Sequence, residues 1–165
     1  MNTIKNFFDK IQKAEEIFCV IILIAMVIAA FAQVLIRYII KISIPGPEEL
    51  SRLFSIMLTF MGCAIAVRES SQISIGVLDN VLADKPMLKK IQNIIVYVLG
   101  IIFATIFSYL FYDYFVYSIK SKQVTIALGV PLAIAIGTML ISMVFTLLHY
   151  IELLVGQISD KPQNN

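Results

Sequence analysis

The chain has 165 residues, of which 59% are hydrophobic and only 15% are charged, and its mean hydropathy is +0.90. This composition is far more apolar than that of soluble domains, and it indicates one small integral membrane domain. A net charge of +2 is too small to indicate nucleic acid as a partner. Cys19 and Cys63 both lie within apolar runs, so we expect packing residues rather than a disulfide framework.

Four apolar stretches, at 18–36, 53–67, 94–112 and 124–151, dominate the chain. A helix rises about 1.5 Å per residue, so roughly 20 residues cross a hydrocarbon core of about 30 Å. The stretches lack the alternation of apolar and polar residues that barrel strands show. Apart from closed barrels, only helices satisfy the backbone hydrogen bonds inside lipid. We therefore predict an all-α integral membrane protein with transmembrane helices at 15–40, 47–68, 86–117 and 126–155.

A further helix is predicted at 3–14, before the first span. Its apolar residues Ile4, Phe7, Phe8 and Ile11 have the spacing of one helical face, and lysines flank them. A basic amphipathic helix of this kind tends to lie in the headgroup plane, so phospholipid is an expected partner of this segment.

The orientation follows from the lysines and arginines that flank the spans, because cytoplasmic flanks carry the excess. With the N-terminus inside, the cytoplasmic flanks hold the larger set, which is Lys5, Lys10, Lys13, Arg68, Lys85, Lys89, Lys90 and Lys161. The opposite flanks hold Arg37, Lys41, Arg52, Lys120 and Lys122. Both termini are therefore predicted in the cytoplasm.

The most polar membrane segment is the start of the second span, where Glu48, Glu49 and Arg52 have helical pair spacing. Gln33 and Arg37 end the first span on the same side of the membrane. These five residues could form one cluster at the interface. We favour a structural ion-pair lock that orients the helices and docks a partner subunit; an ion or substrate site is the alternative.

Pairs of small residues mark candidate helix-packing faces, because they let backbones approach closely in lipid. The pairs are Ala25 with Ala29, Gly62 with Ala66, Gly100 with Ala104, and Ala133 with Gly137. The centre of the membrane carries almost no charge, and His149, the single histidine, is expected near the end of the last helix. No catalytic, cofactor or metal motif is present in the sequence, so we do not expect an enzyme.

Several motifs resemble the small, DctQ-like membrane subunit of tripartite ATP-independent periplasmic (TRAP) transporters. They are Arg37-Tyr38, the run PGPEELSRL at 45–53, the run FMGCAIAVR at 60–68, Gln72-Ile73, Asp79, and the run ALGVP at 127–131. The order of the motifs and the four-helix layout both agree with that family. The chain departs from it at Pro47, Gln72 and Gly137, where Trp, His and Pro are common in the family.

This resemblance implies a bacterial inner-membrane subunit without a substrate site of its own. Its partners would be a large membrane subunit that holds the substrate and sodium sites, and a periplasmic substrate-binding protein. The substrate would be a carboxylate, such as a C4-dicarboxylate or sialic acid. The alternatives are a self-contained four-helix exporter, a membrane anchor of a redox complex, and a structural membrane protein. The lack of a central acid in the first span disfavours the exporter, and the single histidine disfavours a bis-histidine haem anchor.

Overall fold

The computed structural model describes residues 2–41, 44–69 and 86–159. Within these ranges the chain forms the helices α1 (Asn2–Leu35), η1 (Ile36–Ile40), α2 (Pro45–Arg68), α4 (Pro86–Lys120) and α5 (Ala133–Ser159), and it forms no strand. Four segments are long and apolar enough to cross a membrane: Asp9–Ile39, Pro45–Arg68, Lys90–Lys120 and Ala133–Gln157. The predicted all-α membrane fold with four spanning helices is confirmed.

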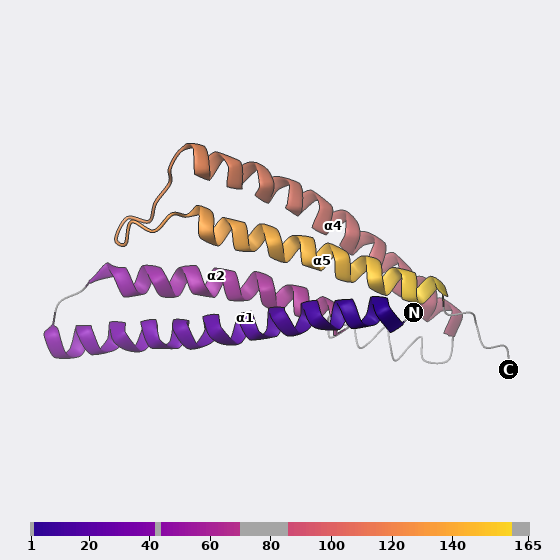
Figure 1. Cartoon of the computed structure of the whole chain (residues 1–165), viewed down its shortest axis with the longest axis horizontal. Coiled ribbons are helices and arrows are strands. Elements are labelled where there is room, and N and C mark those ends of the chain that lie inside the picture. The colour runs from indigo at the N-terminus through magenta and orange to yellow at the C-terminus, as the bar shows by residue number, and fades with distance from the viewer. Residues whose placement is uncertain (1, 42–43, 70–85, 160–165) are drawn as a thin grey trace.

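The helices lie in a row rather than in a closed square. The helix α1 packs on α2, α2 packs on α5, and α5 packs on α4. Figure 1 shows the two pairs α1–α2 and α4–α5 side by side, with α1 beginning and α5 ending at the same end. We call this the proximal end, and we call the other end, where α1 ends and α5 begins, the distal end.

The outer helices present wide apolar surfaces, as expected of helices that face lipid or another membrane subunit. The exposed large residues include Ile17, Ile24, Val27 and Phe31 on α1, and Leu99, Phe103, Ile106 and Tyr109 on α4. The interior of the row is built where α1, α2 and α5 meet. Its buried members are Ile22, Met57 and Ala135, and Phe18, Leu53, Phe54 and Leu58 pack against them.

The amphipathic helix predicted at 3–14 is not confirmed as a separate element. The helix α1 runs without a break from Asn2 to Leu35, because Ala14, Glu15 and Glu16 favour helix and no Pro or Gly interrupts the segment. Of the predicted stripe, Ile11 is half-buried, whereas the side chains of Ile4, Phe7 and Phe8 lie outside the described part of the chain. The helix then ends in the π-helical turn η1.

The last span begins later than the expected 126. Residues 121–132 form a compact connector in which Val124 and Pro131 make an antiparallel bridge, and Gly129 adopts a φ of 65°. Pro131 has no N–H to donate and Gly129 favours a turn, so α5 begins only at Ala133. The third span is longer than expected, because α4 continues beyond 117 to Lys120.

Candidate functional site

The last residue of α2, Arg68, joins three helices at the proximal end. Its guanidinium lies 2.6 Å from the Asp9 carboxylate and also donates to the Gln12 side chain, both on α1. Its Nε lies 3.3 Å from Glu152 Oε2 on α5. Only 12% of the Arg68 side chain is exposed, so these partners replace water around a cation at the end of a span.

A second contact, one helical turn deeper, links α1 directly to α5. His149 Nε2 lies 3.3 and 3.2 Å from the two carboxylate oxygens of Glu15, and both side chains are buried. The second ring nitrogen, Nδ1, lies 3.9 Å from Glu152 Oε2, the oxygen that also faces Arg68. These contacts form one network, which we call the Arg68 cluster and which consists of Asp9, Gln12, Glu15, Arg68, His149 and Glu152.

Local helix geometry explains how the cluster assembles. Residues spaced by three or four positions share one face of a helix, so Asp9, Gln12 and Glu15 point from α1 in one direction. The same rule places His149 and Glu152 together on α5. Because α2 lies between α1 and α5, its terminal Arg68 reaches both neighbours. The cluster therefore fixes how α1, α2 and α5 are rotated relative to one another.

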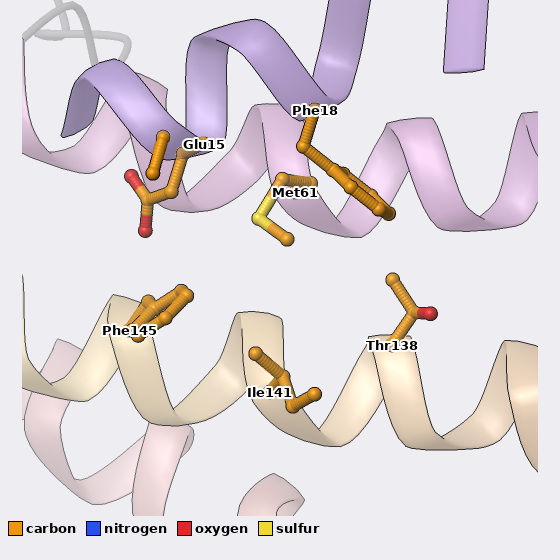
Figure 2. Close-up of a pocket in the computed structure, with 7 residues that line it drawn as sticks. Glu15, Phe18, Met61, Thr138, Ile141 and Phe145 are labelled. Atoms are coloured by element: carbon orange, nitrogen blue, oxygen red, sulfur yellow. The ribbon is translucent and has the colours of Figure 1, made fainter. Parts of the chain in front are cut away.

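An apolar cleft of about 280 Å³ lies beside Glu15, between α1, α2 and α5. Figure 2 shows Phe18 of α1 and Met61 of α2 on one side, and Thr138, Ile141 and Phe145 of α5 on the other. Apart from Glu15 and Thr138, its lining is hydrocarbon, sulfur or ring. Glu15 is already engaged by His149, so the cleft suits an apolar group better than a charged solute.

At the distal end, Glu49 ties α2 to the connector between α4 and α5. Its carboxylate accepts the backbone N–H groups of Ile126 and Ala127 at 2.9 Å and that of Leu128 at 3.2 Å. Three consecutive N–H groups that point to one carboxylate make an anion-binding nest. The connector is thereby held against the first turns of α2, where Gly46 leaves room for the Leu128 side chain.

The structure brings together only part of the polar group predicted at this end. Glu48 and Arg52 form an exposed pair at 3.4 Å, whereas Glu49 turns to the connector instead of Arg52. Gln33 is half-buried near the end of α1, and Arg37 is exposed in η1. Among the described residues, no ion pair joins Arg37 to either glutamate.

The small-residue pairs occupy different environments. Gly100 lies directly under the ring of Tyr150 and Gly137 faces Phe115, so both glycines serve the α4–α5 contact. Ala104, on α4, is completely buried. Ala29 is buried on α1. Gly62 faces open space, and Ala25, Ala66 and Ala133 are half-buried.

Sequence reasoning did not single out the Arg68 cluster. The sequence predicts His149 near the end of the last helix, and the structure buries it completely between helices. Two signals pointed to the cluster: the His149–Glu152 spacing, and the presence of Glu15, Arg68 and Glu152 at span ends on the same side of the membrane. These signals indicated that the residues lie at a similar depth in the membrane, but they did not show which faces of the helices pack together.

The comparison with known families agrees with this architecture. The sequence model of the family "Tripartite ATP-independent periplasmic transporters, DctQ component" matches residues 26–160, which is most of the chain. The chain belongs to this family. Its members are components of transporters, so this DctQ-type chain is a multi-pass inner-membrane transport component and not an enzyme.

A relative from Haemophilus influenzae supports the same assignment. It is named "Putative TRAP transporter small permease protein" and is 42% identical over 72 residues. The match covers 44% of this chain and 45% of the relative, so it spans less than half of either protein.

Proposed function

We propose that this DctQ-type chain is the small permease subunit of a sodium-coupled TRAP transporter and acts as a scaffold for the large membrane subunit. The observation that carries the proposal is the position of the charged residues. The sequence of α1 has no Asp, Glu, Lys, Arg or His between Glu16 and Arg37, and that of α2 has none between Arg52 and Arg68. Ion-coupled carriers place such groups near the middle of the membrane.

The other two spans also lack ionisable residues at their centres. The sequence of α4 carries no such residue between Lys90 and Asp113, and that of α5 carries none before His149. The charges that do occur near span ends are largely engaged within the chain, as Arg68, Glu15 and Glu49 show. Substrate and sodium sites are therefore assigned to the large subunit.

The scaffold role rests on how the row of helices is tied at both ends. The Arg68 cluster joins α1, α2 and α5 at the proximal end, and Glu49 joins α2 to the α4–α5 connector at the distal end. A row held at both ends suits a stationary support against which another subunit moves. Its exposed apolar surfaces would be covered by that subunit and by phospholipid.

The substrate and the remaining partner are proposed from the family. The substrate class is a carboxylate of the C4-dicarboxylate or sialic acid type, and a periplasmic binding protein delivers it. The orientation proposed from the lysines and arginines places both termini, and with them the Arg68 cluster, on the cytoplasmic side.

Reconstitution into proteoliposomes tests the function. Uptake of labelled succinate or sialic acid should require this chain, the large subunit, the binding protein and an inward sodium gradient together. The chain reconstituted alone should show no uptake of either compound. Sodium-driven uptake by the chain alone would overturn the scaffold role.

Cysteine labelling tests the orientation. Single cysteines are introduced as Asn2→Cys or Asn164→Cys after both native cysteines are replaced by serine. An impermeant maleimide should label them only after the cells are opened. Labelling in intact cells would place the termini outside the cytoplasm.

A further inference from the structure

We propose that the cleft beside Glu15 binds one anionic phospholipid, with an acyl chain between α1, α2 and α5 and the phosphate beside Lys10. The cleft has a volume of about 280 Å³. It opens to the outside of the chain, because Ala14 and Ile141, two of its lining residues, are exposed. The inference concerns the chain itself and does not depend on the transported substrate.

The cleft results from the way the helices are arranged. The helices α1 and α5 each pack on α2 and far less on each other, and the Glu15–His149 contact joins them near the proximal end. Beyond that contact Met61 of α2 lines the space between them. Figure 2 shows Glu15 and Phe145 toward one end of the cleft and Thr138 toward the other. Thr138 and Phe145 are seven positions apart, so the cleft follows α5 for roughly 10 Å. This elongated shape, parallel to the spans, is that of an acyl chain segment.

The polar groups of the lining already have partners within the chain. Glu15 is bound by His149, and the Thr138 hydroxyl donates to the backbone C=O of Ile134 at 3.0 Å. An ordered water would need about two to four polar partners, which this lining does not offer. An acyl chain needs none, and it supplies the dispersion contacts that the apolar walls would otherwise lack.

The headgroup is assigned from the charge at the proximal mouth of the cleft. Lys10 is exposed and lies one turn before Ala14 on the same face of α1. Within the described part of the chain Lys10 forms no ion pair. A lysine at the membrane surface attracts anionic headgroups. This cation favours a lipid over an apolar side chain of a neighbouring subunit as the occupant, because such a side chain would gain nothing from it.

The sequence contains no tryptophan, which allows a site-specific test by fluorescence. The full chain is placed in vesicles of phosphatidylcholine that contain a minor fraction of phosphatidylglycerol with brominated acyl chains, which quench tryptophan on contact. Phe18→Trp and Phe145→Trp report from the two walls of the cleft, and Phe103→Trp reports from the exposed surface of α4. We expect both cleft reporters to be quenched several times more strongly than Phe103→Trp. Equal quenching at all three positions would overturn the proposal, and so would weaker quenching in the cleft, which would indicate a protein side chain as the occupant.

Two charge variants test the position of the phosphate. In the Phe18→Trp chain, Lys10→Gln should lower the preference for brominated phosphatidylglycerol over brominated phosphatidylcholine about fivefold, the effect expected of one lysine at the membrane surface. Lys13→Gln is the matched control, because Lys13 is also exposed but points to a different side of α1 from Ala14. It should change the preference much less. Equal losses in the two variants would show only a diffuse attraction to the membrane surface and would contradict a phosphate seated at Lys10.

A third variant tests the path of the acyl chain. Ala14→Phe places a ring at the exposed mouth of the cleft. It should reduce the quenching of Phe145→Trp to the level of Phe103→Trp, while circular dichroism shows unchanged helix content. Quenching of Phe145→Trp that persists in a folded Ala14→Phe chain would show that no acyl chain enters the cleft past Ala14, and the proposal would be wrong.

Discussion

Glu49 Oε1 accepts the backbone N–H of Ile126 at 2.9 Å, although the two residues are 77 positions apart in the sequence. The same carboxylate accepts the N–H groups of Ala127 and Leu128 through its other oxygen. One side chain of α2 therefore orders the turn that precedes α5. At the distal end, this contact links the α1–α2 pair to the α4–α5 pair, in addition to the packing of α2 on α5.

Replacing Glu49 should loosen the connector. In Glu49→Ala the three N–H groups lose their common acceptor, so we expect faster hydrogen exchange at the amides of residues 126–128. Hydrogen–deuterium exchange with mass spectrometry measures this. The control is Glu48→Ala, whose side chain pairs with Arg52 instead of the connector. Equal exchange in both variants would show that Glu49 does not hold the turn.

Replacing Arg68 should destabilise the chain more than replacing any of its exposed charged residues. In Arg68→Ala, Asp9, Gln12 and Glu152 lose their common guanidinium, at a cost of about 3 kcal/mol, the lower end of the range for breaking a buried pair. Thermal unfolding in nanodiscs should show a lower Tm. The variant Arg68→Lys should recover only part of the loss, because lysine cannot reach Asp9, Gln12 and Glu152 with a planar fork.

Arg52 provides a contrasting case at the distal end. Its side chain is 72% exposed and its pair with Glu48 is open to solvent, so Arg52→Ala should change the stability of the isolated chain by about 0–1 kcal/mol. We still propose this pair as a contact with the large subunit. Co-purification should therefore fall in Arg52→Ala while the Tm of the chain alone stays constant. Unchanged assembly would remove the pair from the proposed interface.

Two glycines allow a test of helix packing with the same substitution. A Cβ at Gly100 would overlap the ring of Tyr150, so Gly100→Ala should cost about 1–3 kcal/mol through overpacking between α4 and α5. A Cβ at Gly62 meets nothing within 4 Å. Gly62→Ala should therefore be neutral or stabilise α2 by up to about 1 kcal/mol, because alanine favours helix. The unfolding temperatures of the two variants provide the comparison.

The number and kind of elements could be predicted from the sequence because they depend on local properties. The runs that become α1, α2, α4 and α5 are apolar over a membrane thickness, and a helix satisfies its own backbone within one segment. The points where the helices are interrupted could also be predicted in part from the local sequence, since the prolines at 45 and 131 mark the ends of loops. The compact connector before Ala133 was harder to predict, because its apolar residues belong to the same hydrophobic run as the last span.

The sequence by itself determined the four spans, the nearly uncharged membrane centre and the family resemblance. Only the tertiary structure decided which polar groups meet. Glu15 and His149 are 134 positions apart, and their contact requires a particular rotation and depth of α1 against α5. Likewise, Glu49 had a plausible partner in Arg52 one turn away, yet three backbone N–H groups of a distant turn bind it instead. Helix rotation and loop placement follow from the summed packing of all the helices, so no local pattern could specify them.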